Sequence, residues 1–183
     1  MASLYQQALA ELDRVFVDLD RDGVQGAVDE IAHARTIALY GVGREGLQIK
    51  GLAMRLFHLG LKVGVVGEMT APAIGPGDLL VVSAGPGQFA TVGALIAVAK
   101  AAGARVLVIT AQSAGEAAAQ ADLTLVVPAQ TMASDRDAAT SVLPMGSLYE
   151  GALFLLFEII VLKLRHRMDV DPAAMRANHT NLE

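Results

Sequence analysis

The sequence predicts an α/β protein in which helices cover both faces of a parallel β-sheet. Short aliphatic segments alternate with segments of helical spacing along most of the chain. The hydrophobic fraction of 54% and the mean hydropathy of +0.47 are high for a soluble protein and typical of strands buried on both faces. A length of 183 residues suits one domain with a sizeable core.

Composition also excludes several classes of protein. The longest apolar run, residues 151–162, is too short to span a membrane and contains Glu158. The first 16 residues predict an amphipathic helix with acidic residues, not a signal peptide. The absence of cysteine excludes disulfides and thiolate chemistry. We therefore expect a cytoplasmic protein with no membrane association, and the net charge of −5 argues against nucleic-acid binding.

Two helices are expected before the first strand. Residues 3–20 place their apolar side chains on one helical face, and residues 24–31 predict a second, shorter helix. Together they form an N-terminal helical arm, residues 1–34, which precedes the strand–helix core.

The strand–helix core is expected over residues 35–128. Aliphatic segments predict five strands, at 37–40, 62–66, 79–82, 106–109 and 123–127. Helical spacing predicts helices between them, at 47–59, 91–102 and 115–121. Because strands alternate with helices, right-handed crossovers and a parallel sheet follow.

A polar loop, residues 128–143, separates this core from a C-terminal region, residues 144–183. The loop is long enough to be functional or mobile. Residues 145–168 predict a long helix that is apolar on nearly every face from 152 to 162. Such a helix is expected to be buried on all sides, and since one domain would not cover it, we expect a subunit interface. Pro172 predicts the start of a last short helix.

The turn from Gly41 to Gly46 is the first candidate site. A strand, a glycine turn and a helix in succession aim backbone N–H groups at an anion. The turn also fits the dinucleotide-binding pattern G-x-G-x-x-G, and Glu68 stands near the place of the acid that holds a ribose hydroxyl. A tight turn that only allows the helix to pack on the strand explains the glycines equally well.

Five segments taken together resemble the 6-phospho-3-hexuloisomerases of the sugar isomerase (SIS) domain superfamily. They are GVGREG at 41–46, MRLFHLG at 54–60, VGEMTAP at 66–72, LPMGSLYE at 143–150 and NHTNLE at 178–183. The resemblance covers the whole chain and implies a single SIS domain, a flavodoxin-like sheet of five parallel strands. It also implies a homotetramer, or at least a dimer, that isomerises a sugar or sugar phosphate without a metal or an organic cofactor.

Isomerisation of this kind requires a base that removes a carbon-bound proton and donors that stabilise an enediolate. A carboxylate in a partly dry pocket has the raised pKa that suits the base. The resemblance assigns this role to Glu150, which could otherwise be a solvated acid in the first turn of a helix. It assigns a second catalytic role to His179, which in SIS isomerases commonly reaches a neighbouring subunit's pocket. The expected substrate-binding residues are Gly43, Arg44, Glu45, Glu68, Ser83, Gly85, Gly87, Gln88 and Thr91.

Two departures from the family pattern concern the phosphate-binding loops. Glu45 stands where the family usually has a serine in the first turn. The second loop, residues 83–91, is one residue longer, and Pro86 and Phe89 replace a serine and a threonine. Glu45 would place a negative charge beside a phosphate dianion, at a cost of about a few kcal/mol at 4 Å near a protein surface. We therefore expect phosphate binding to be weakened.

Two alternative functions remain open from the sequence. One is a non-catalytic SIS domain that binds a sugar derivative, although the presence of Glu150 and His179 argues against it. The other is a dinucleotide-binding domain that uses the turn from Gly41 to Gly46 together with Glu68. The latter leaves the segments at 143–150 and 178–183 without an explanation.

Overall fold

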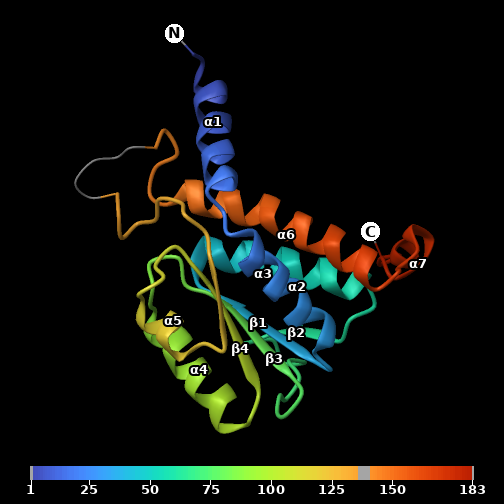
Figure 1. Ribbon diagram of the computed structural model, residues 1–183. Helices are drawn as coiled ribbons and strands as arrows, with labels where there is room; N and C mark the ends of the chain where they lie inside the picture. The colour runs from blue at the N-terminus through green and yellow to red at the C-terminus, as the bar shows by residue number, and fades with distance from the viewer. Residues whose placement is uncertain (1, 136–140, 183) are drawn as a thin grey trace.

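Five parallel strands form the centre of the structure, a computed structural model that describes residues 2–135 and 141–182 (Figure 1). The strands are β1 (Ile37–Gly41), β2 (Val63–Val65), β3 (Leu79–Ser83), β4 (Arg105–Thr110) and β5 (Leu123–Val126). Their spatial order is β2-β1-β3-β4-β5. This confirms the predicted flavodoxin-like, doubly wound sheet. The order reverses between β1 and β3, where such sheets open their ligand-binding crevice.

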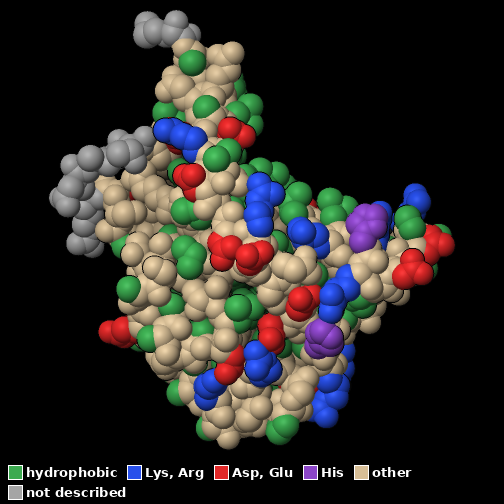
Figure 2. All heavy atoms as spheres, viewed as in Figure 1, with side chains coloured by type: hydrophobic (Ala, Val, Ile, Leu, Met, Phe, Trp, Pro, Cys, Tyr) green, Lys and Arg blue, Asp and Glu red, His purple; other side chains and the backbone are tan. Residues whose placement is uncertain are grey.

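Helices cover both faces of this sheet, and their bounds lie within a few residues of those predicted. The helices on one side of the sheet are α2 (Arg21–His33), α3 (Gly43–His58) and α6 (Ser147–Arg167), and α1 (Leu4–Val17) packs on α6. Those over the other are α4 (Ala90–Ala101) and α5 (Glu116–Gln120). The short α7 (Pro172–Ala177) follows α6. Figures 1 and 2 show that α1 projects from the body and bears hydrophobic side chains along its length. Among the described residues, no helix is long and apolar enough to cross a membrane.

The aliphatic strands are explained by burial on both faces. Leu39 of β1 pairs in register with Val81 of β3, which pairs with Leu107 of β4, and all three belong to the core beneath α2, α3 and α6. One residue further along, the side chains point to the opposite face, where Val82 and Val108 pack with α4 and α5. The three central strands, β1, β3 and β4, therefore supply apolar side chains to two cores.

The long helix α6 is only half covered within this chain, as expected of a helix that one domain is too small to bury on all sides. It packs on α1, α2 and α3, which bury the face containing Leu153, Phe157 and Ile160. Neither the sheet nor another described element covers its opposite face, and Phe154 remains 57% exposed. The helix also begins at Ser147 instead of residue 145, since the two residues before it have positive φ angles.

Candidate active site

A cavity of about 490 Å³ opens at the carboxyl edge of the sheet, beside β1 and β3. Its walls come from the first turn of α3, the loop after β3, the segment that follows β5 and the start of α6. The residues that line it are Val42, Gly43, Arg44, Glu45, Pro86, Phe89, Thr131, Met132, Ala133, Met145, Gly146, Tyr149 and Glu150. The predicted residues Gly43, Arg44, Glu45 and Glu150 are thus brought together from segments a hundred residues apart.

Close packing of two glycines brings α3 to this edge. A Cβ atom at Gly46 would lie 2.5 Å from the carbonyl oxygen of Gly41, so the helix can start directly over the end of β1 only without a side chain there. Gly43 has a φ of +57°, in the left-handed region that favours glycine. The N-terminus of α3, with its unpaired N–H groups and positive end of the helix dipole, therefore faces the cavity.

Glu150 lies in the first turn of α6 and is held by Arg44 of α3. The Arg44 Nε is 3.1 Å from Glu150 Oε2, and Arg44 Nη1 donates to Ser147 Oγ at 2.7 Å. Arg44 also donates to the carbonyl of Met145, which has an unusual φ of 55°. Burial raises the pKa of Glu150, the positive charge of Arg44 opposes that rise, and the charge of Glu45 adds to it. The result is an oriented, partly dry carboxyl group with the raised pKa expected of a base.

Glu45 is buried beneath the cavity, only 6% exposed, and occupies hydrogen-bond donors that follow β3. Its Oε2 accepts from Ser83 Oγ at 2.6 Å and from the Gly85 N–H at 3.0 Å. Burial raises the pKa of Glu45, and the hydrogen bonds from Ser83 and Gly85 oppose this rise. The three predicted residues therefore do meet, but they bind one another.

Tyr149 is a site residue that the sequence did not reveal. It is 1% exposed, and its hydroxyl lies 3.3 Å from Ser83 Oγ. When Glu45 is ionised, the Ser83 hydroxyl donates to it, and the Tyr149 hydroxyl is then the donor in this contact. Burial raises the pKa of Tyr149 well above its ordinary value, and the charge of Glu45 adds to the rise. Its place directly before Glu150 in the segment LPMGSLYE was the signal in the sequence, and an aromatic residue at this position also fits the core.

The segment after β5 forms the outer wall of the cavity, which the sequence analysis identified only as a polar loop. Thr131 is buried and accepts from the Ala133 N–H at 3.2 Å. Further along, the Val142 N–H donates to Glu11 of α1 at 3.0 Å, and Ser141 Oγ donates to the same carboxylate. The projecting α1 thus anchors a segment that leads to the active site. The part of the predicted loop at 136–140 lies outside the described residues.

None of the five predicted substrate-binding residues of the second loop lines the cavity. Ser83 and Gly85 lie behind Glu45, and the other three lie further away. Gly87, with a φ of +99°, packs on Gln112 and Gly115. Gln88 lies against Gly93 of α4, and the exposed Thr91 is in the first turn of that helix.

Two further predicted residues lie away from Glu150 within the same chain. Glu68 lines two grooves between α3 and β2, one of which also touches Gly41 and Gly46. The exposed His179 stacks beside His58, the last residue of α3, with ring centroids 5.0 Å apart. Since the 16 residues of α3 span about 24 Å, His179 lies far from the cavity at the other end of this helix. No group of three or more His, Asp or Glu side chains suited to a metal ion occurs in the described part of the chain.

Comparisons with known proteins agree with this geometry. The SIS domain family model matches residues 30–154. The 3-hexulose-6-phosphate isomerase of Bacillus subtilis strain 168 is 30% identical over 177 residues, which are 97% of this chain and 96% of the relative. The Mycobacterium gastri enzyme of the same name is 34% identical, over 90% of this chain and 82% of its own length.

A solved structure from Methanococcus jannaschii, from which a function of 3-hexulose-6-phosphate isomerase was inferred, is also similar. It superposes with a TM-score of 0.82 at 27% identity and covers 98% of this chain and 97% of its own. The fold, the family model and these relatives lead to one conclusion: this chain belongs to the SIS domain family.

Proposed function

We propose that the protein is a sugar isomerase that moves a carbonyl group between neighbouring carbons of a hexulose, with Glu150 as the base. The observation that supports this most strongly is the Arg44–Glu150 pair, an oriented carboxylate with a raised pKa at the wall of a cavity of about 490 Å³. The relatives named 3-hexulose-6-phosphate isomerase support a reaction between a 3-ketose and a 2-ketose.

In the proposed reaction, Glu150 removes the proton from C2 of a 3-ketohexose and an enediolate forms across C2 and C3. The protonated Glu150 exchanges its proton with solvent and delivers a proton to C3, while a proton moves between the two oxygens, so that the product is a 2-ketohexose of identical composition. Arg44 and the N-terminus of α3 supply positive charge and N–H donors for the developing oxyanion. The transfer uses protein side chains alone, so adding EDTA is expected to leave the rate unchanged.

The reaction is tested by proton NMR of fructose and fructose 6-phosphate incubated with the enzyme in D₂O. Removal of the C3 proton of a 2-ketose is the reverse reaction, so the C3–H signal should disappear while a 3-ketohexose accumulates to equilibrium. Exchange at C1 instead would indicate an aldose–ketose isomerase. If neither position of either sugar exchanges, the protein is not an isomerase of this type.

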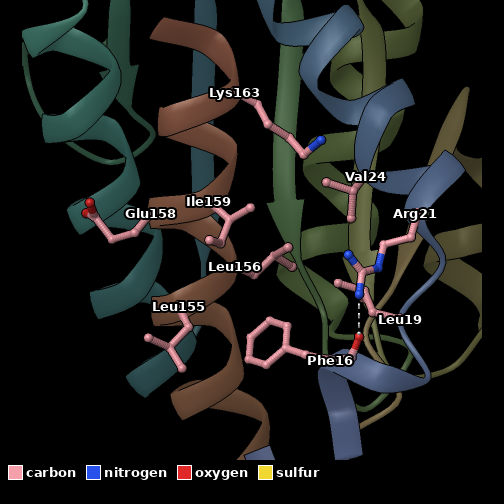
Figure 3. A pocket seen from close by; sticks show the side chains of 9 residues that line it. All are labelled: Phe16, Leu19, Arg21, Val24, Leu155, Leu156, Glu158, Ile159 and Lys163. Atoms are coloured by element: carbon pink, nitrogen blue, oxygen red, sulfur yellow. Dashed lines mark hydrogen bonds between the residues drawn. The ribbon is translucent and has the colours of Figure 1, made fainter. Parts of the chain in front are cut away.

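We also propose that the protein acts as a homo-oligomer, a tetramer or a dimer. A second cavity of about 520 Å³ lies between α6 and the corner joining α1 to α2. Figure 3 shows Phe16, Leu156 and Ile159 converging there, while Glu158 points to the other side of α6. Exposed apolar side chains continue along α1 and α6, and patches of this kind are uncommon on monomers. Light scattering should give a mass of two or more times the 19.1 kDa of one chain. Phe154→Glu should weaken the interface and lower the measured mass towards that of one chain.

In such an oligomer, we propose that His179 completes the active site of a neighbouring subunit, because its own cavity is out of reach. His179→Ala should lower the exchange rate, and mixing this variant with an inactive Glu150→Gln variant should restore part of it. Failure of the mixture to recover activity would refute a shared site. We propose a cytoplasmic location for the enzyme, which cell fractionation tests.

A further inference from the structure

Glu45 occupies hydrogen-bond donors where an anion would be expected to bind. Ser83 ends β3 and Gly85 follows it, at the point where the strand order reverses, which is where doubly wound sheets bind ligands. A hydroxyl and a backbone N–H at such a turn are typical donors to phosphate. In this chain both donate to the same oxygen of Glu45, at 2.6 and 3.0 Å.

The rest of this turn has no other donor to offer. The Ala84 N–H donates to the carbonyl of Ile109 at 2.9 Å, and the Gly87 N–H donates to the carbonyl of Ala84 at 2.8 Å. Pro86 has no N–H group. From the hydroxyl of Ser83 to Gly87, every donor of the turn is therefore either engaged within the protein or missing.

The charges around the cavity also oppose an anion. Its lining contains one cation, Arg44, and two acids, Glu45 and Glu150. Arg44 is already paired with Glu150 at 3.1 Å, so the charge of Glu45 has no partner among the lining residues. A phosphate dianion near Glu45 would meet a like charge on a buried side chain, where repulsion is stronger than at an open surface.

We propose that Glu45 is the specificity-determining residue of this enzyme and that it selects a ketose whose end nearest Glu45 bears an uncharged hydroxyl in place of a phosphate. The inference rests on the proposed isomerase function and names its substrate class. A hydroxyl group can both donate and accept, so it can pair with the Glu45 carboxyl in either protonation state. A phosphate dianion has only acceptor oxygens, finds no free donor in the turn after β3, and meets the charge of the Glu45 carboxylate. The relatives named for a 6-phosphate substrate would differ from this chain in that respect.

Two substitutions at Glu45 distinguish the effect of the occupied hydrogen-bond donors from the effect of the negative charge. Glu45→Ser removes both, because it frees Ser83 and Gly85 and deletes the carboxylate. Glu45→Gln removes the charge only, since its amide oxygen can still accept from the same two donors. Glu116→Ser is a matched control, because Glu116 is an exposed acid in the first turn of another helix, α5.

The measurement is kcat/KM for C3–H exchange with fructose and with fructose 6-phosphate, together with calorimetric titration by inorganic phosphate. The wild type and Glu116→Ser should prefer fructose by about tenfold or more and should not bind phosphate. Hydrogen bonds to a charged group and removal of a like charge should raise the kcat/KM of Glu45→Ser for fructose 6-phosphate by about ten- to a hundredfold. Glu45→Ser should also bind inorganic phosphate, whereas Glu45→Gln should gain much less in both measurements.

Wild-type enzyme that turns over fructose 6-phosphate as well as fructose, with no gain in Glu45→Ser, would overturn the inference while leaving the isomerase function intact. Loss of all exchange in wild type and variants would instead refute the isomerase function. In that case the calorimetry still decides the role of Glu45. If the wild type binds phosphate and Glu45→Ser does not bind it more tightly, the proposed role of Glu45 is contradicted. If Glu45→Ser does not fold, the wild type is compared with Glu45→Gln. Equal or tighter phosphate binding by the wild type would also contradict the proposed role of Glu45.

Discussion

Replacing Gly85 with alanine should destabilise the protein and disturb the active site at the same time. A Cβ atom at this position would lie 2.8 Å from Cε1 of Tyr149 and 3.0 Å from Oε1 of Glu45. Contacts under about 3 Å force a movement, and both neighbours are buried side chains, 1% and 6% exposed. Tyr149 is further held by its contact with Ser83, so neither ring nor carboxylate can move without losing hydrogen bonds.

The expected cost follows from overpacking of a buried site. Inserting one carbon into a packed core costs about 1–3 kcal/mol, and the two blocked neighbours favour the middle of this range. For a chain of this length, ~2 kcal/mol corresponds to a fall of about 4–8 °C in the melting temperature. Because Glu45 and Tyr149 line the cavity, the rate of C3–H exchange should fall together with stability.

Thermal unfolding followed by circular dichroism measures this effect, with Gly51→Ala as the matched control. Gly51 lies inside α3, and a Cβ atom there would have no neighbour within 4 Å. Alanine is favoured over glycine in a helix, so the control should be stabilised by about 0.5–1 kcal/mol. A Gly85→Ala variant with the wild-type melting temperature and full activity would refute the close packing of Glu45 and Tyr149.

Two further predictions concern pH. Burial raises the pKa of Glu150 above its ordinary value of 4.5, so the acid limb of kcat/KM should lie above that pH, because the base is lost as it takes up a proton. Arg44→Met should move this limb to higher pH, since the positive charge of Arg44 favours the ionised carboxylate of Glu150. An unchanged limb would show that Arg44 does not influence the pKa of the base. Hydrogen bonding to Arg35 lowers the pKa of Asp78 from 3.8 to about 2. The stability that this shift provides is therefore present above about pH 4 and lost as the pH falls towards 2. In urea unfolding, the free energy of unfolding of Asp78→Asn should decrease less than that of the wild type over this pH range.

The fold could be predicted from the sequence because its signals are local. Each buried strand is a short aliphatic run, and runs such as residues 79–82 are recognisable without their partners. The sequence indicated that one domain would not cover α6, but it could not indicate which face of the helix its own chain covers, since the helix is apolar on nearly every face.

The active site was predicted in part, for a related reason. Glu150 and Arg44 could be chosen as candidates because they stand in recognisable motifs at helix starts, and the structure places them in contact. The sequence placed Glu45 beside the ligand, but its direction, inward to Ser83 and Gly85, depends on contacts 38 and 40 residues away. Tyr149 was missed because hydrophobic spacing identifies a buried aromatic residue but not the partner of its hydroxyl.

The central claim, that Glu150 moves a carbon-bound proton, is tested most directly by solvent deuterium exchange into the substrate by Glu150→Gln. Glutamine has the shape of glutamate but cannot accept the proton, so the exchange rate should fall by about a hundredfold or more, the usual contribution of a general base. The variant's melting temperature and calorimetric ligand affinity should stay close to those of the wild type. Exchange at the wild-type rate in a folded Glu150→Gln variant would contradict the account and remove Glu150 from the role of base.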